Sequence, residues 1–257
     1  MADGICLKYA DILDGLRKAG LERGMLAEVH SSLRSFGYVE GGADTVIRAL
    51  LDCVGTEGGI VMPAFLISPP VPMDAEDAAQ GVTQKLRILP ENHRVRSGMG
   101  VIADTFSRRT DVLTGQGLFR VSAWGRDRSV NCRGFQNVID SGGLGVLLGV
   151  DIYRLSSMHY MENDLPEEVR AIFRPSEAVR RRYPEGEWFV ETGEPPVKAW
   201  YRIQDEAYRR GYIRETYIGP CKCMSFVVRD VVSLYKTALE TDPLGLYGLR
   251  QGKWGAV

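Results

Sequence analysis

The first 65 residues alternate between helical and strand-like hydrophobic patterns, and this order restricts the possible folds more than any other feature of the chain. Residues 1–20 carry apolar side chains at helical spacing, whereas 25–33 reads as a strand that runs into a polar turn. Residues 41–55 then form a clear amphipathic helix, and 58–65 a short buried strand. A helix between two strands is typical of a βαβ unit, which predicts a parallel or mixed sheet covered by helices.

The rest of the chain continues this pattern around one insertion. We expect further helices at 98–109, 154–163, 199–211 and in the second part of 223–240, and further strands at 120–125, 144–150, 187–192 and at the start of 223–240. Residues 66–98 follow no clean period and include a proline- and acid-rich stretch, which predicts a loop-rich insertion. Without a repeat or a linker, residues 1–257 are expected to form a single three-layer α/β/α domain with a central mixed sheet.

Composition restricts the partners and the compartment. The 257 residues are 44% hydrophobic and 25% charged, with a net charge of −1, so we expect no nucleic-acid partner. No apolar run is long enough for a membrane span and residues 1–20 lack the core of a signal peptide, so no membrane association is expected. Five irregularly spaced cysteines favour neither a disulfide framework nor a metal site and predict a reducing, cytoplasmic location. The oligomeric state stays open.

Two of the three histidines follow predicted strands. His30 stands where 25–33 leaves its strand, and His159 comes shortly after 144–150, whereas His93 lies in a polar loop without an evident partner. In open α/β sheets, ligands bind beyond the carboxyl ends of the strands. His30 and His159 are therefore the candidates for chemistry.

Glu162 follows His159 by three positions, a spacing that places both side chains on one helix face. The carboxylate could orient the imidazole and stabilise its protonated form, and histidine has a pKa suited to a general base near neutrality. The alternative is an ordinary surface pair, and the spacing alone favours that alternative.

A turn of small residues follows His30. Ser31 and Ser32 precede a glycine-rich stretch and the start of the helix at 41–55, where unpaired amides and the positive end of the helix dipole gather. Such a turn suits a phosphate or a pantetheine carbonyl. The alternatives are a histidine that only bonds to backbone and glycines that only cap a helix.

Long blocks of the chain resemble a known family. VHSSLRSFGYVEGGADTVIRALLDCVGTEGGIVMPAF (29–65) is similar to the opening block of the aminoglycoside 3-N-acetyltransferase family, and GVLLGVDIYRLSSMHYMEN (145–163) resembles its strand block with the H-x-x-E pair. SGMGVIADTFSRR (97–109) and WYRIQDEAYRRGYIRETYIG (200–219) are similar to later helices and a strand of that family. The resemblance spans nearly the whole chain.

The resemblance implies an acyltransferase of antibiotic resistance that uses acetyl-coenzyme A as cosubstrate and a small cationic amine as acceptor. It implies direct transfer to an aminoglycoside-like amino group, with a catalytic set of His159, Glu162 and His30. Transferred residue by residue, the coenzyme-binding set is Ser31, Ser32, Leu33, Arg34, Phe36, Gly37, Gly41, Gly42 and Ser156. Ser156 stands where the family usually has threonine.

One departure concerns the acceptor. Where the family usually has R-S-x-H-P-x-x-S, Gln116 takes the place of the histidine, Gly117 that of the proline and Arg120 that of the serine. The acceptor of this chain is therefore open, and two alternatives remain. The chain could acylate a non-aminoglycoside amine in biosynthesis, or it could be an inactive coenzyme A-binding protein.

Acidic residues of two segments favour a cationic acceptor. We expect the 66–98 insertion to be a lid over the acceptor site and to supply Asp74, Glu76 and Asp77. The segment after Glu162 adds three acids, which are Asp164, Glu167 and Glu168. Each exposed ion pair contributes only about 0–1 kcal/mol, so several acids would have to act together.

Overall fold

The computed structural model describes residues 6–163, 165–193 and 197–250 and centres on a seven-stranded sheet. Its strand order is β10 (Arg214–Ile218), β11 (Cys221–Val227), β8 (Leu144–Leu148), β2 (Leu26–Ser31), β4 (Gly59–Pro63), β7 (Val121–Gly125) and β6 (Leu113–Thr114). β2 is parallel to both β8 and β4, and the other neighbours are antiparallel. The sheet is therefore mixed, as predicted, and its three parallel strands end at one edge.

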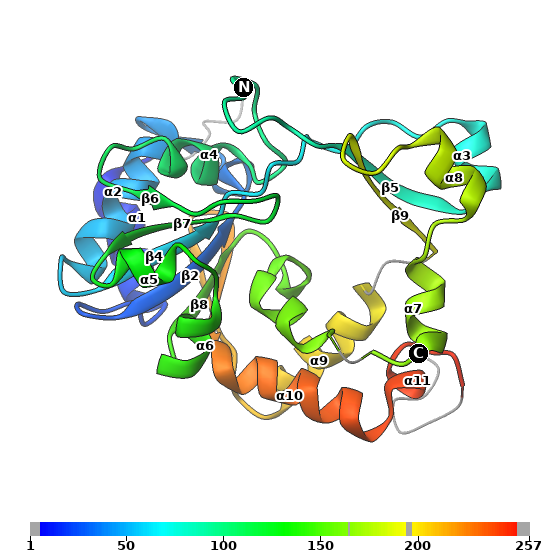
Figure 1. The fold of residues 1–257 in the computed structure, drawn as a ribbon. Helices are drawn as coiled ribbons and strands as arrows, with labels where there is room; N and C mark the ends of the chain where they lie inside the picture. The colour runs from blue at the N-terminus through cyan, green and yellow to red at the C-terminus, as the bar shows by residue number, and fades with distance from the viewer. Residues whose placement is uncertain (1–5, 164, 194–196, 251–257) are drawn as a thin grey trace, which may run out of the picture.

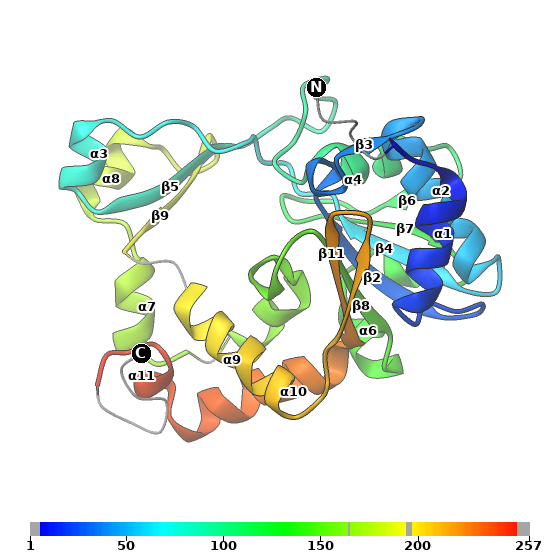
Figure 2. The same ribbon diagram turned by 180° about the vertical axis from the view of Figure 1, so that it is seen from behind.

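Helices cover both faces of this sheet (Figures 1 and 2). One face carries α1 (Tyr9–Lys18), α2 (Gly42–Val54) and α4 (Val101–Ser107), and the other carries α6 (Gln136–Ser141), α9 (Val197–Arg209) and α10 (Val228–Thr241). Along β2, Ala27 and Val29 pack into the core under α1 and α2. Strand alternation then turns Glu28 and His30 toward the other layer. The three-layer α/β/α prediction is confirmed.

The insertion at 66–98 contains regular structure as well as loops. α3 (Ala75–Ala79) is followed by β5 (Val82–Arg87), which pairs antiparallel with β9 (Trp188–Thr192), and α8 (Glu177–Arg182) packs beside them around a small core. We call α3, β5, α8 and β9 the side lobe, and Figure 1 shows it apart from the large sheet. Periodicity missed α3 and β5 because each is short and β5 finds its partner about a hundred residues later.

Short elements complete the fold. They are β1 (Cys6–Leu7), η1 (Leu33–Phe36), β3 (Tyr38–Val39), α5 (Arg128–Asn131), η2 (Ile152–Arg154), η3 (Ser156–Met161), α7 (Glu167–Phe173) and α11 (Pro243–Leu246). The helix expected over 154–163 is thus two 3₁₀ turns rather than one α-helix. Side chains three positions apart are still neighbours in a 3₁₀ turn. Among the described helices, none has the length and apolar composition needed to cross a bilayer.

Candidate active site

His159 lies on η3, beyond the carboxyl end of β8, and its side chain is 56% exposed. Its Nδ1 is 2.7 Å from Glu162 Oε2. Because the carboxylate accepts at Nδ1, the imidazole proton is held there and Nε2 keeps a lone pair. His159 therefore presents an accessible nitrogen that can take a proton from a ligand.

The Glu162 carboxylate is also hydrogen-bonded on its second oxygen. Its Oε1 accepts a hydrogen bond of 2.9 Å from the hydroxyl of Tyr235 on α10, and that hydroxyl lies 2.5 Å from the Tyr247 hydroxyl. The indole ring of Trp200, from α9, lies with its centroid 4.8 Å from that of the His159 ring. The side chains of Tyr235 and Trp200 are both buried. His159 and Glu162 thus rest on a buried aromatic layer, which a solvated surface pair lacks.

The surroundings of His159 shift its titration. The surrounding protein displaces part of the water around the imidazole, which by itself disfavours the imidazolium, but the hydrogen bond and charge of Glu162, with the charges of Glu191 and Glu28, outweigh that effect. The pKa of His159 is therefore raised above its ordinary value. Glu191 belongs to β9, so the side lobe contributes directly to the electrostatics of this site.

His30 lies beneath η3 and is only 6% exposed. Its Nε2 is 2.8 Å from Glu28 Oε1 and 3.3 Å from the backbone nitrogen of Ser156. Glu28 Oε1 also accepts from the backbone nitrogen of Ser157, at 3.2 Å. The side chains of Glu28 and His30 therefore bind the first backbone amides of η3. Both are buried, so neither is exposed beside His159.

The turn expected to bind coenzyme joins β2 to η1 and lies against the end of β8. The Ser32 amide donates to the carbonyl of Leu148 at 2.8 Å, and the Ser35 hydroxyl donates to the carbonyl of Gly149 at 3.0 Å. The amides of Leu33 and Arg34, which open η1, have no backbone acceptor within the described residues. Unpaired donors thus occur on a turn that is tied to the strand preceding η3.

Other residues of the predicted coenzyme-binding set differ in whether their amides or side chains are accessible to a ligand. Gly41 (φ 75°) and Gly42 (φ 59°) open α2 without a side-chain cap, so the first amides of α2 stay available. Phe36 is fully buried in the core, so its side chain is not accessible to a ligand and only its backbone can contact one. Ser156 is 8% exposed, so little of its side chain is accessible to a ligand.

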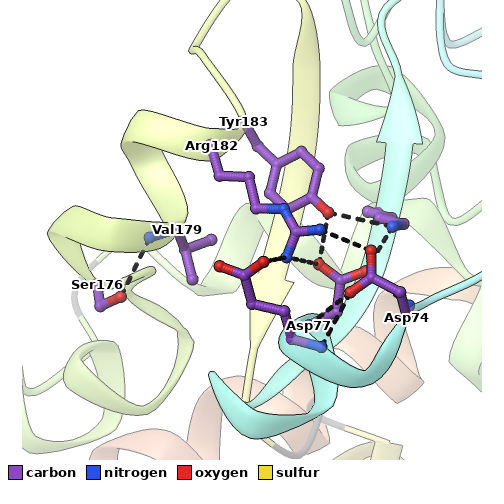
Figure 3. Close-up of polar contacts among 8 residues, drawn as sticks. Asp74, Asp77, Ser176, Val179, Arg182 and Tyr183 are labelled. Atoms are coloured by element: carbon purple, nitrogen blue, oxygen red, sulfur yellow. Dashed lines mark hydrogen bonds and ion pairs between the residues drawn. The ribbon is translucent and has the colours of Figure 1, made fainter.

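Three acids expected to bind the acceptor are instead paired inside the side lobe (Figure 3). Arg182 of α8 contacts Asp74 Oδ2 at 2.6 Å, Glu76 Oε2 at 2.9 Å and Asp77 Oδ1 at 3.5 Å. Asp77 is buried and also accepts from Lys85 and Tyr183. The structure therefore gives no support to the expectation that these acids hold a cationic acceptor, because all three carboxylates are engaged by Arg182 or Lys85 within the lobe.

The acids expected after Glu162 provide little support for a cation-binding site. Glu167 is paired with Arg174 at 2.8 Å, and Glu168 is exposed on α7. Asp164 lies outside the described residues. Gln116, the residue in the place of the family histidine, is exposed in the loop that joins β6 to β7.

Sequence reasoning missed the residues that support and surround His159. Glu28, Tyr235, Trp200 and Glu191 all shape its environment, yet none stands beside it in the chain. Glu28 carried the one available signal, since an acid two positions before a histidine in an otherwise apolar strand is unusual.

Comparison with known proteins supports the resemblance seen in the sequence. The model of the aminoglycoside 3-N-acetyltransferase family matches residues 29–240. A SPbeta prophage-derived aminoglycoside N(3')-acetyltransferase-like protein of Bacillus subtilis is 34% identical over 129 residues, a match that spans 46% of each chain. Aminoglycoside N(3)-acetyltransferase III of Acinetobacter baumannii is 25% identical over 272 aligned positions, which cover 89% of this chain and 90% of that protein.

Solved structures share the fold. The apoenzyme of aminoglycoside acetyltransferase AAC(3)-IVa superimposes with a TM-score of 0.69 at 20% identity, covering 96% of this chain and 93% of that one. AAC-IIIb in a binary complex with CoASH gives 0.66 at 18% identity, covering 92% and 97%. Because the family model spans most of the chain, this protein belongs to the aminoglycoside 3-N-acetyltransferase family, a family of acyltransferases.

Proposed function

We propose that this protein transfers the acetyl group of acetyl-coenzyme A directly to an amino group of an aminoglycoside-like acceptor, with His159 as the general base. The observation that carries the proposal is the exposed imidazole whose Nδ1 is held by Glu162 at 2.7 Å. Membership of the family and the CoASH complex of a protein with the same fold support acetyl-coenzyme A as the donor.

The reaction follows from the state of the amine. An ammonium group has no lone pair, so His159 Nε2 first removes a proton from it. The neutral nitrogen attacks the thioester carbonyl, a C–N bond forms and the oxygen becomes negatively charged. The C–S bond then breaks and the coenzyme leaves as a thiolate. The acylated nitrogen, which is positively charged after the attack, loses its second proton to give the amide, and the thiolate takes a proton to give free coenzyme A. No acyl-enzyme is formed.

Other groups of the site position the reactants. The unpaired amides of Leu33 and Arg34 are suited to a carbonyl or an oxyanion, and the start of α2 at Gly42 is suited to a phosphate. Tyr235 keeps Glu162 in place, and Glu28 with His30 holds η3 from below. His30 is a positioning residue in this proposal, because its Nε2 already contacts Glu28 and the Ser156 amide.

Two measurements test the proposal. Titration calorimetry with coenzyme A should show binding, and absence of binding at millimolar coenzyme would remove the acetyltransferase function altogether. Release of free thiol from acetyl-coenzyme A should then depend on an added aminoglycoside. Turnover of an uncharged amine without any aminoglycoside turnover would favour the biosynthetic alternative, and binding without turnover of any amine would favour an inactive coenzyme-binding protein.

A further inference from the structure

Trp200 of α9 packs against the imidazole of His159, the proposed base. The two ring centroids are 4.8 Å apart and the ring planes are inclined by 56°. The His159 side chain is 56% exposed, whereas Trp200 is only 1% exposed. The imidazole therefore lies between the solvent, from which an acceptor arrives, and a buried indole.

Two other aromatic residues hold the indole in place. Between ring centroids, Tyr153 of η2 lies 6.4 Å from Trp200 at an angle of 62°, and Tyr235 of α10 lies 6.0 Å from it at 68°. Both are edge-to-face contacts, one of the arrangements that aromatic pairs prefer. The packing of α9 against η2 and α10 thus fixes Trp200 independently of His159.

The groups that titrate around His159 are mainly acids. They are Glu162 on its own turn, Glu191 on β9, Glu28 and His30 on β2, and Tyr235 on α10. The indole adds an attraction of another kind, because the π face of an aromatic ring is electronegative and attracts a cation within about 6 Å of the ring centroid. The contact of Trp200 with His159 lies inside that distance.

We propose that Trp200 is a positioning residue that stabilises the imidazolium form of His159 through a cation–π interaction. This inference rests on the proposed function only where it treats His159 as the base. In the transfer step, His159 Nε2 takes a proton from the acceptor ammonium, and the ring becomes the imidazolium that Trp200 stabilises. A more stable imidazolium makes His159 a stronger base.

An indole that only fills space predicts the opposite change. If Trp200 only excluded water, its removal would hydrate the imidazolium and raise the pKa of His159. Removal of a cation–π partner lowers that pKa instead. The direction of the shift therefore separates the two roles, and it is measured without acceptor or coenzyme.

NMR titration of the histidine ring protons measures the pKa of His159, whose resonance is assigned by its absence in His159→Ala. Trp200→Leu should lower this pKa by roughly 0.4 to 1.5 units, and Trp200→Phe, which keeps a weaker π face, by less. The decrease should persist in a Glu162→Gln background, because the ring contact is direct. The control is Trp188→Leu, since Trp188 packs on Tyr183 within the side lobe and should not affect the pKa of His159.

Indole fluorescence gives a second test that needs no change at Trp200, whose replacement leaves a cavity in the core. Contact with an imidazolium quenches the emission of an indole. The emission of wild type should therefore fall as the pH drops through the pKa of His159, and His159→Gln should abolish this step.

The outcomes separate this inference from the proposed function. An unchanged or raised pKa in both Trp200 variants, or absence of the emission step in wild type, would overturn the inference. A lowered pKa in a protein that acetylates no amine would leave the inference standing and sink the transferase proposal. Where acetylation occurs, the acid limb of kcat/KM should move to lower pH in Trp200→Phe together with the pKa, a change that loss of packing alone would not produce.

Discussion

Tyr235 donates its hydroxyl to the Glu162 carboxylate at 2.9 Å, although 73 residues of chain separate the two. The other oxygen of that carboxylate bonds to His159, so α10 fixes the orientation of the proposed base through one intermediate group. Catalytic histidines depend on such a third partner to hold their tautomer and geometry.

Removal of the Tyr235 hydroxyl should weaken catalysis without removing the base. We expect Tyr235→Phe to lower kcat roughly 3- to 30-fold, because a hydrogen bond of about 0.5–2 kcal/mol no longer holds Glu162. Tyr247→Phe is the matched control, since Tyr247 reaches Glu162 only through Tyr235. Steady-state kinetics of thiol release compare the two, and a larger loss in Tyr247→Phe would contradict this arrangement.

His159→Ala should lower kcat by roughly two to four orders of magnitude, the usual effect of losing a general base. Coenzyme affinity, measured by calorimetry, should stay near that of wild type because the proposed coenzyme contacts lie on η1 and α2. Near wild-type turnover in His159→Ala on a verified acceptor would show that the pair with Glu162 is structural.

The pH profile should report the raised pKa of His159. Only the neutral imidazole acts as a base, so kcat/KM should fall as the pH drops through that pKa, with a midpoint above the ordinary value of about 6.5. Glu162→Gln removes the largest raising effect and should move the midpoint to lower pH. An unchanged midpoint in this variant would show that another group controls the acid limb.

His30 is expected to act on η3 and not on the substrate proton. His30→Ala removes the imidazole that lies between Glu28 and the Ser156 amide and should lower kcat roughly 10- to 100-fold by displacing η3. His30→Gln retains a side chain that can hydrogen-bond to Glu28 and to the amide, and should restore part of the loss. If His30→Gln is as impaired as His30→Ala and both change the pH profile, His30 takes part in proton transfer instead.

Substitution of Gly149 tests whether the turn after β2 and the end of β8 together bind the coenzyme. A Cβ at Gly149 would lie 2.1 Å from Ser35 Cβ, and its φ of 68° disfavours other residues. Gly149→Ala should therefore raise the KM for acetyl-coenzyme A roughly 10- to 100-fold. Gly24→Ala has a similar φ of 84° with nothing within 4 Å, so it should lower stability without changing that KM.

Acid should loosen the side lobe. Lys85 and Tyr183 hydrogen bonds outweigh burial and hold the pKa of Asp77 well below its ordinary value. A depressed pKa contributes stability above the unfolded value of about 4, and that stability is lost as the pH falls below it. The protection of α3 and α8 against hydrogen exchange, taken relative to the intrinsic exchange rate at each pH, should fall below pH 4 in wild type. Asp77→Asn should show fast exchange already at pH 7, and unchanged exchange would contradict the role of this cluster.

Local sequence determined a large part of this protein. The hydrophobic periods of 25–33, 41–55 and 58–65 predicted β2, α2 and β4, because each period depends only on neighbouring residues burying one face. The contact of His159 with Glu162 was likewise predictable, since three positions along a turn bring two side chains together whether the turn is α or 3₁₀.

Tertiary structure alone decided which charges are available and what supports the base. Asp74 and Arg182 stand 108 residues apart, and their ion pair, formed when α3 meets α8, removes an acid that composition had suggested for the acceptor. Glu191 lies on the face of β9 away from the lobe core because β9 pairs with β5 in one register, and a shift by one residue would turn it inward. The free energy of a charge depends on its partners and burial, and those are fixed only when distant segments pack.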